Sequence, residues 1–447
     1  MASLSDHPTV QAIRNKQATE PTPPPATPLD ATWLRNLCLE AGVDDVGFVH
    51  IDRPELDDQR ADILAVFPHA KTLISMVGRM NRENVRSPAR SLANNEFHHT
   101  DKALEDQARS IVATLERRGI RAINPAVGFP MEIQHFPGKT WIISHKPVAI
   151  AAGLGQMGIH RNIIHPRFGN FILLMTIVID AEVTSYTSPI NYNPCLECKL
   201  CVAACPVGAI GADGHFNFTA CFTHNYREFM GGFTDWVEQI ADSKDKADYH
   251  DRVTPSETAS MWQSLSFGAN YKAAYCMAVC PAGEDVIGPF LANRKTYLNE
   301  VVKPLQNKKE SVYVVAGSDA EAYVSRRFPH KTIRRIGSGL TIQSIQSFLG
   351  GLSLAFQREQ AGDLRATYHF TFTGREAQTA TITIEEKKLK VLPGHVGKAD
   401  VAIKVDSSTW INMLNGRIQT IWAVLTGKLK VKGNIRLLQA FQRCFPR

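Results

Sequence analysis

The chain has 447 residues, of which 44% are hydrophobic and 21% are charged, and its formal net charge is +7. This length exceeds what one hydrophobic core usually holds, so two or three domains are expected. No run of eighteen apolar residues occurs, which argues against a membrane span. Residues 1–30 lack an apolar export signal and become proline-rich between Pro21 and Pro28. We therefore expect a disordered tail on a cytoplasmic protein.

The charge is distributed unevenly along the chain. Residues 310–447 carry 20 Lys and Arg against 10 Asp and Glu, whereas residues 1–309 carry 30 against 33. The first part is slightly acidic and offers no broad phosphate-binding face. For the basic last part, a solvated surface is favoured over nucleic-acid binding.

Residues 31–190 alternate between helical and strand patterns, which predicts an α/β domain. Residues 101–120 have apolar positions at helical spacing, with Gly119 as a plausible C-cap. The other expected elements are a helix over 31–42 and strands within 43–51, 70–80 and 170–180.

Residues 191–302 carry seven of the nine cysteines. In a reducing compartment, clustered cysteines indicate metal binding or catalysis more often than disulfides. The run Cys-x2-Cys-x2-Cys-x3-Cys-Pro is the ligand pattern of bacterial two-cluster ferredoxins, in which the fourth thiolate reaches the other cluster. A zinc ribbon would separate two cysteine pairs by a long loop. The run consists of Cys195, Cys198, Cys201 and Cys205.

The same crossing rule assigns Cys280 to the first cluster, with Cys195, Cys198 and Cys201. The second cluster then has only Cys205, Cys221 and Cys276. A complete motif would place its fourth cysteine at residue 273, which is Ala273. The second centre is therefore either a [3Fe–4S] cluster or a [4Fe–4S] cluster with a foreign ligand such as His224. Cys38 and Cys444 are expected to be small buried residues.

Upstream of the cysteines, "AGLGQMGIHRNIIHPRFGN" leads into a buried strand and then into the cluster motif. With the solitary Cys221 and the closing Cys-x3-Cys-Pro, this order resembles the cobalamin-dependent reductases, which include epoxyqueuosine reductase and the reductive dehalogenases. The resemblance covers roughly residues 35–300. It weakens across the 54 residues between Cys221 and Cys276 and at Ala273.

The resemblance implies a nitroreductase-like α/β domain that binds cobalamin, with two clusters delivering electrons to it. It further implies that the loop carrying four glycines and Arg161 faces the corrinoid; the glycines are Gly153, Gly155, Gly158 and Gly169. The family's catalytic aspartate corresponds to Lys139, and a catalytic tyrosine is not found nearby. Reductive cleavage needs a proton donor. The candidates are Lys139, His145 and His160.

After a linker over residues 303–334, residues 335–447 predict a separate α+β domain. Strands are expected at "TYHFTFTG", "TATITIEE" and "KLKVLPG", and amphipathic helices follow Ser407. The residues Asp406, Thr409 and Trp410, followed by "LTGKLKVKG", resemble the sterol carrier protein 2 (SCP2) domain. That resemblance implies an apolar ligand site between sheet and helices, although a closed core is the alternative.

Together these patterns predict a multidomain α/β and α+β oxidoreductase that contains [4Fe–4S] clusters and cobalamin. It would cleave a bond reductively in a hydrophobic substrate held or delivered by the SCP2-like domain, using an external electron donor such as a ferredoxin, a flavodoxin or a reductase. The alternatives are a cobalamin-free electron carrier and a lipid-binding protein whose clusters are structural.

Overall fold

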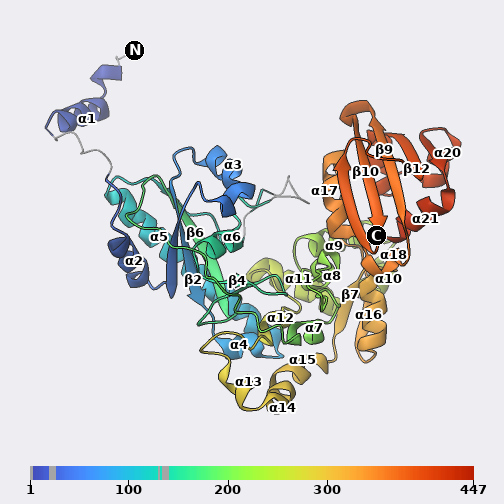
Figure 1. Cartoon of the computed structure of the whole chain (residues 1–447), viewed down its shortest axis with the longest axis horizontal. Helices are drawn as coiled ribbons and strands as arrows, with labels where there is room; N and C mark the ends of the chain where they lie inside the picture. Colours follow the sequence, from blue (N-terminus) through green and yellow to red (C-terminus); the bar gives the residue numbers. More distant parts are fainter. Residues whose placement is uncertain (1–3, 20–26, 129–130, 133–139, 447) are drawn as a thin grey trace.

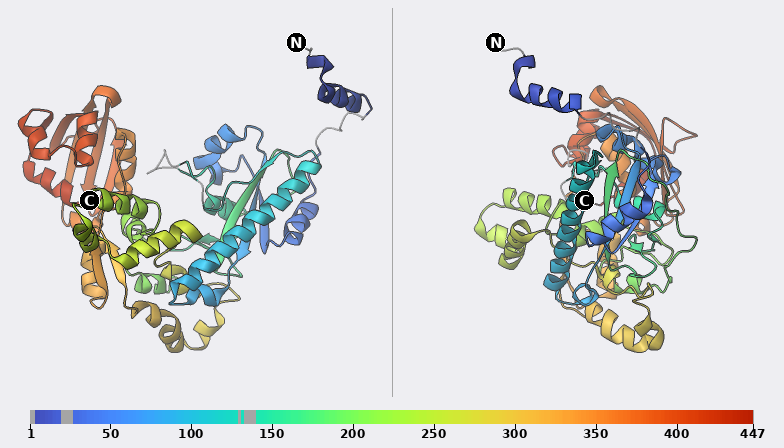
Figure 2. Two further views of the ribbon diagram at one scale, coloured as in Figure 1. Left: turned by 180° about the vertical axis from the view of Figure 1, so that it is seen from behind. Right: turned by 90° about the vertical axis from the view of Figure 1, so that its left-hand side faces the viewer.

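The computed structural model describes residues 4–19, 27–128, 131–132 and 140–446. An α/β domain, a cysteine-bearing region of short helices and a C-terminal α+β domain follow one another along the chain (Figure 1). The cysteine-bearing region lies between the two sheets, which are at opposite ends of the molecule (Figure 2). Within the described residues, no helix combines the length and apolar character that crossing a membrane requires.

The first domain is built on one four-stranded sheet. Its elements are α2 (Ala31–Glu40), β1 (Asp45–His50), α3 (Asp57–Val66), β2 (Thr72–Arg79), α4 (Arg82–Arg86), α5 (Arg90–Arg117), β3 (Ala122–Ile123), α6 (His145–Ala151), β4 (Gln156–Met157), β5 (Ile163–Ile164) and β6 (Ile172–Ile179). The strand order is β1-β2-β6-β3, and each neighbouring pair is antiparallel. Helices α2 and α5 cover one face of the sheet, and α3 and α6 cover the other.

The predicted elements of this domain are confirmed. β2 and β6 lie at the centre of the sheet and are almost wholly buried, as their continuous apolar sequence requires. Helix α5 begins eleven residues earlier than expected and ends at Arg117. Gly119 follows with φ +78°, a left-handed conformation that glycine adopts without steric cost.

The cysteine-bearing region consists of short helices around a shared core. These are α7 (Leu200–Ala204), α8 (Phe218–Asn225), α9 (Gly231–Ala241), α10 (Lys246–Arg252), α11 (Pro255–Phe267), α12 (Tyr275–Ala278), α13 (Gly288–Ala292) and α14 (Arg294–Tyr297). Residues 222–275, across which the resemblance weakens, form α9, α10 and α11. This segment is held by a buried ion pair between Arg227 and Asp235, 2.6 Å apart.

Two segments differ from the prediction. Residues 8–19, within the tail expected to be disordered, form helix α1 (Pro8–Thr19). Pro8 occupies the first helical position, which proline tolerates, and no glycine or further proline follows before Thr19. Within the predicted linker the chain forms α15 (Lys303–Gln306), β7 (Ser311–Val314), α16 (Asp319–Arg327) and β8 (Thr332–Arg335).

The segment 303–334 is therefore a small parallel β-α-β unit. Val312, Val314 and Val324 are buried in the same hydrophobic core as the cysteine helices. The polar sequence "KPLQNKKES" gave the appearance of a linker, whereas the apolar residues after it are too few to predict a buried unit.

The C-terminal domain has a five-stranded sheet of order β11-β10-β9-β12-β13, in which only β9 and β12 are parallel. Its elements are α17 (Ile345–Ala355), α18 (Arg358–Ala361), β9 (Ala366–Thr373), β10 (Gln378–Glu385), β11 (Lys388–Pro393), β12 (Val401–Asp406), α19 (Ser407–Leu414), α20 (Thr420–Leu425), β13 (Leu429–Gly433) and α21 (Ile435–Arg443). The predicted strands and helices are confirmed, and the helix α17 was not predicted.

Candidate iron–sulfur site

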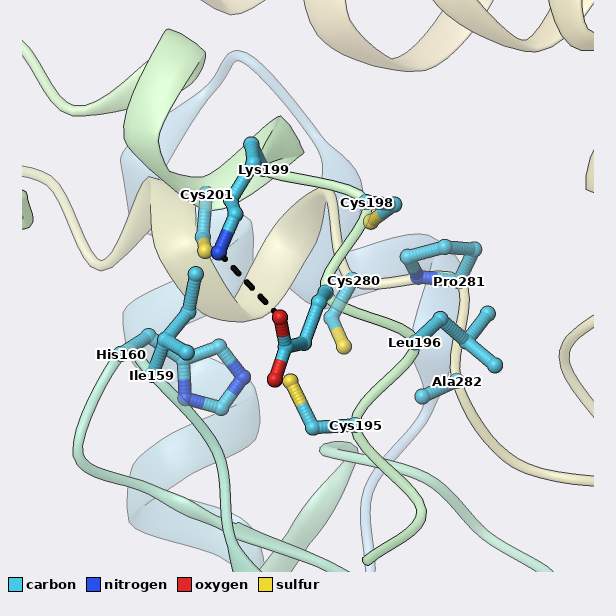
Figure 3. Close-up of a pocket in the computed structure, with 11 residues that line it drawn as sticks. Ile159, His160, Cys195, Leu196, Cys198, Lys199, Cys201, Cys280, Pro281 and Ala282 are labelled. Atoms are coloured by element: carbon cyan, nitrogen blue, oxygen red, sulfur yellow. Dashed lines mark ion pairs between the residues drawn. The ribbon is translucent and has the colours of Figure 1, made fainter. Parts of the chain in front are cut away.

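Four of the cysteines line one pocket. Cys195, Cys198 and Cys201 come from the segment leading into α7, and Cys280 follows α12 (Figure 3). The remaining lining residues are Ile159, His160, Leu196, Glu197, Lys199, Pro281 and Ala282. The structure thus brings Cys280 to the three cysteines that the crossing rule assigned to it.

Left-handed backbone conformations precede two of the cysteines and orient their side chains. Lys199 has φ +61° at the N-cap of α7, and Ala274 has φ +52° at the N-cap of α12. Each stands two residues before a cysteine, Cys201 or Cys276, and non-glycine residues rarely adopt this conformation. Such strain is typical of sites where the surrounding structure fixes the chain for function. The two cysteine helices therefore begin in the same way and pack against each other.

Cys205, Cys221 and Cys276 form a second group. Burial raises the pKa of the Cys221 thiol, and the nearby Cys205 and Cys276 raise it further. The Cys205 sulfur accepts a hydrogen bond from the Ala209 N–H at 3.3 Å. The Asn162 amide lies 3.9 Å from the Cys276 sulfur, so the glycine-rich loop touches this group.

The described residues contain no group of three or more His, Cys, Asp or Glu side chains placed to hold a single metal ion. In a cubane cluster each thiolate binds a different iron atom, so its sulfurs do not converge on one point. The chemistry of the donor set, with cysteines on or directly after α7 and α12 in each group, fits two iron–sulfur centres.

The position of a fourth cysteine in the second group is filled by a methyl group. Ala273 is buried, and its N–H donates to the Asn225 side chain at 3.0 Å. His224 faces β7, where its Nδ1 accepts the Tyr313 N–H at 3.3 Å. The neutral ring then carries its proton on Nε2. Nδ1 of His224 is thus engaged by the backbone, whereas its Nε2 is buried without a hydrogen-bond partner among the described residues.

The candidate proton donors lie in different surroundings. Lys139 is outside the described residues. His160 is buried beside the first cysteine group, and burial, together with the charge of Lys146, lowers its pKa to about 4. Its Nδ1 accepts the Asn162 N–H at 3.2 Å. His160 therefore holds the glycine-rich loop in place as a neutral ring.

His145 is engaged by protein groups at both ring nitrogens. Its Nε2 donates to the Ala126 carbonyl at 3.0 Å, so its Nδ1 accepts from the Thr176 hydroxyl at 2.9 Å. These bonds attach the start of α6 to β6. The arrangement gives His145 a structural place in the α/β domain.

Burial also lowers the pKa of His145, which predicts a pH-dependent stability. Because the folded protein binds this proton less tightly than the unfolded chain, the stabilisation is complete above the ordinary histidine pKa of about 6.5 and is lost below it. We expect the Tm of the wild type to fall between pH 7 and pH 5, and His145→Gln to flatten that fall. Identical pH profiles of wild type and variant in differential scanning calorimetry would contradict this assignment.

Three glycines of the glycine-rich loop lie against other parts of the chain. A Cβ on Gly153 would collide with the Ser188 carbonyl, and one on Gly155 with the Ile164 carbonyl. Gly158 abuts His160. These contacts account for the glycines without an open cradle.

Gly169 and Arg161 instead connect the loop to the cysteine-bearing region. A Cβ on Gly169 would collide with the Ala282 carbonyl, two residues after Cys280. Arg161 is exposed, and its guanidinium donates to the Gly214 carbonyl at 3.1 Å. The Arg161 carbonyl accepts from the exposed Lys146 ammonium at 2.7 Å. The loop therefore fixes the α/β domain against both cysteine groups.

Sequence reasoning did not find the polar network behind Cys276. The neighbouring Tyr275 donates to Glu310 at 2.7 Å, and Glu310 pairs with the buried Lys331, also at 2.7 Å. These residues are separated by 35 and 21 positions, and no local pattern relates them. The segment 303–334 thus supports the helix that carries Cys276.

Two segments of the chain match known protein families. Residues 188–211 match the 4Fe-4S binding domain, and residues 353–446 match the SCP-2 sterol transfer family. An epoxyqueuosine reductase of Cellulophaga algicola is 22% identical over 244 residues, covering 47% of this chain and 74% of the relative. The chain is an oxidoreductase similar to the epoxyqueuosine reductases, with an SCP-2 domain at its C-terminus.

The SCP-2 domain also has relatives of its own. Hydroxysteroid dehydrogenase-like protein 2 of Mus musculus is 32% identical over 74 residues, which are 16% of this chain and 15% of the relative.

A solved epoxyqueuosine reductase from Streptococcus thermophilus aligns with 61% of this chain and 75% of its own length, at 15% identity and a TM-score of 0.33.

The SCP-2 domain is attached directly to the helix that carries Cys221. At the start of α8, the Asn217 amide donates to Gln357 at 3.2 Å and the Thr219 hydroxyl donates to the Leu354 carbonyl at 2.6 Å. Arg358 forms an ion pair with Asp213. These contacts tie the C-terminal domain of this oxidoreductase to its cysteine-bearing region.

Aromatic side chains pack between the sheet and the helices of the SCP-2 domain. The Trp410 ring contacts Phe348, Phe370 and Phe372 at centroid distances of 5.4 to 6.1 Å. Trp410 is buried, and its indole N–H has no hydrogen-bond partner among the described residues. Asp406, by contrast, accepts from the Thr409 N–H at 3.0 Å and caps α19.

Proposed function

We propose that this cytoplasmic protein is a two-centre iron–sulfur reductase that uses cobalamin to cleave a bond in a hydrophobic substrate. The observation that carries the proposal is the separation of seven cysteines into a group of four and a group of three. Each group combines cysteines on or directly after α7 with a cysteine on or directly after α12, and these two helices pack against each other, which supports two neighbouring centres. Electrons from an external donor, a ferredoxin, a flavodoxin or a reductase, would enter through the first centre.

The glycine-rich loop of the α/β domain borders both cysteine groups, the first through Ile159 and His160 and the second through Asn162. Asn162 approaches Cys276, and the exposed cations Lys146 and Arg161 lie in the same part of the loop. Lys146 also donates to the Asn162 side chain at 3.1 Å. A cofactor reduced by the second centre would contact these three residues, and their donors suit amide and phosphate groups.

Cobalamin is the cofactor that the resemblance to epoxyqueuosine reductases and reductive dehalogenases implies. When bound, it supplies a strongly reducing cobalt centre for cleavage of a carbon–oxygen or carbon–halogen bond. Three of the four loop glycines are closed by the chain's own atoms and the fourth contacts Ala282, so they do not form the expected cradle. The residues that would contact the corrinoid are Asn162, Lys146 and Arg161.

The SCP-2 domain supports a hydrophobic substrate. Domains with an apolar interior between sheet and helices suit sterols, fatty acyl compounds or apolar halogenated molecules. The partnerless indole N–H of Trp410 is the one polar group of that side chain, and a ligand oxygen would satisfy it. Because the domain contacts α8, a ligand released from it would enter the molecule beside the second centre.

The test is a titration of anaerobically purified protein with cobalamin, followed by UV–visible and EPR spectroscopy before and after reduction. The proposal predicts stoichiometric binding, base-off cobalt signals and reduction of the corrinoid by electrons that first reduce the clusters. Reducible clusters without corrinoid binding would instead favour a cobalamin-free electron carrier. Clusters that do not change redox state, with stoichiometric bound lipid, would favour a lipid-binding protein with structural clusters.

We further propose that the second centre is a [3Fe–4S] cluster, or a [4Fe–4S] cluster with one iron free of cysteine, because Ala273 replaces a thiolate. Ala273→Cys is expected to add a ligand: it should raise the iron content by about one atom per chain if the centre is [3Fe–4S], and change only the EPR spectrum if the centre is already [4Fe–4S]. Mössbauer and EPR spectra should show the change at the second centre only. Ala274→Cys, at the adjacent position, is the control. An iron content and EPR spectrum unchanged by Ala273→Cys would contradict the assignment.

A further inference from the structure

The end of the SCP-2 domain exposes a group of large apolar side chains. Ile421, Trp422 and Leu425 of α20 are 73%, 60% and 78% exposed, and Ile435 at the start of α21 is 55% exposed. We call these four residues the α20 patch. Ala423, on the opposite side of α20, is fully buried and holds the helix on the domain core. Burial of Ala423 thus orients the larger side chains of α20 outward.

The segment of the chain that carries the α20 patch is basic. Residues 407–447 contain seven Arg and Lys and no Asp or Glu. The six that the structure describes are all exposed, and none of them has an ion-pair partner there: Arg417, Lys428, Lys430, Lys432, Arg436 and Arg443. Elsewhere in the domain, cations on the surface form ion pairs with carboxylates. Lys387, for example, pairs with Glu359.

The position of the patch leaves it open to a large partner. α20 lies at the outer edge of the C-terminal domain, away from the α/β domain and the cysteine helices, in both Figure 1 and Figure 2. β13 is the edge strand of its sheet, and Lys430 and Lys432 are both exposed on it. Apolar and basic groups therefore share one end of the molecule.

We propose that the α20 patch and its basic surroundings dock the protein onto an anionic lipid bilayer. Exposed aliphatic and tryptophan side chains insert at the level of the lipid headgroups, while Lys and Arg attract anionic lipids. Charge complementarity favours an anionic bilayer over a second copy of this basic patch. A nucleic acid would match the charge but would leave Ile421 and Leu425 without an apolar environment. This inference does not depend on the clusters or on cobalamin.

Docking would give the SCP-2 domain direct access to lipid-dissolved molecules. A hydrophobic ligand could then pass from the bilayer to the domain without crossing water, and α8 would lie at the other side of the domain. The chemical class of partner is an anionic phospholipid surface.

The experiment is co-sedimentation of the full-length protein with vesicles of phosphatidylcholine alone or with about 30% phosphatidylserine. Binding is expected only with phosphatidylserine and should weaken as salt rises. Leu425→Ser should weaken binding by about tenfold or more, because it removes an apolar side chain that inserts into the bilayer. The double variant K430E/K432E should also weaken binding by about tenfold or more, because each basic residue contributes about fivefold to the binding constant. Blue-shifted tryptophan fluorescence on binding should disappear in Trp422→Ser.

The matched control is Trp262→Ser. Trp262 is an equally exposed tryptophan, 58% against 60% for Trp422, on α11, where Glu257 lies in the first turn. Its replacement should leave vesicle binding unchanged. The proposal would be overturned by absence of binding at low salt, or by vesicle binding that the substitutions on α20 leave unchanged. Dimerisation through the patch, or tighter binding to single-stranded RNA than to vesicles, would also overturn it.

Discussion

Replacing Cys280 with serine is expected to remove one complete cluster and to leave the other in place. Cys280 shares a pocket with Cys195, Cys198 and Cys201, so its loss deprives that centre of one of four thiolates. About four iron atoms per chain should be lost, and the remaining EPR signal should be that of the second centre. Iron and sulfide analysis with EPR of the reduced protein measures both.

The complementary variant is Cys221→Ser, which should remove only the second centre because its thiol interacts with Cys205 and Cys276. Cys444→Ala is the control, since Cys444 is fully buried in the SCP-2 domain, away from both groups. Far-UV circular dichroism separates cluster loss from unfolding. If the Cys280 and Cys221 variants lost the same EPR signal while still folded, the assignment of the two groups would be wrong.

Lys331→Met is expected to destabilise the protein by about 3 kcal/mol, because it removes the buried counter-charge of Glu310 and leaves only the more exposed Lys308, 3.3 Å from that carboxylate. The Lys331 side chain is 1% exposed and that of Glu310 is 12% exposed. Burial alone would raise the pKa of Glu310, but the hydrogen bonds from Lys331 and Tyr275 outweigh it and lower that pKa. Urea unfolding monitored by circular dichroism measures the change in free energy.

The variant K331M/E310Q provides the control for the network. It removes both charges but keeps an acceptor for the Tyr275 hydroxyl, so most of the lost stability should return. Because Tyr275 precedes Cys276, the single variant should also release iron from the second centre faster than the double variant does. Equal stability of the single and double variants would contradict a paired role for Lys331 and Glu310.

The sequence was most informative where spacing along the chain sets geometry. The Cys-x2-Cys-x2-Cys-x3-Cys run and the second Cys-Pro predicted the grouping of Cys280 with Cys195, and these two cysteines line one pocket. Short runs of β-branched and aromatic residues predicted β9 and β10, and continuous apolar runs predicted β2 and β6. In these cases the deciding interactions repeat at short and regular intervals.

The sequence was least informative where distant residues meet. The pairing of Lys331 with Glu310 makes residues 303–334 part of the cysteine-bearing core, although their polar beginning suggested a linker. His224 is three residues from Cys221 on one helix, yet Tyr313 of β7 fixes its ring. Likewise, Gly169 is required by the carbonyl of Ala282, more than a hundred residues away. Such constraints follow from tertiary contacts and leave no local pattern.

The central claim is that seven thiolates hold two iron–sulfur centres beside each other. Quantification of iron, acid-labile sulfide and zinc in anaerobically purified full-length protein, combined with EPR of the reduced sample, tests it most directly. The account predicts about seven or eight iron atoms and about eight sulfides per chain, with magnetic interaction between two reduced centres. A preparation that contained zinc, or fewer than about four iron atoms per folded chain, would contradict it.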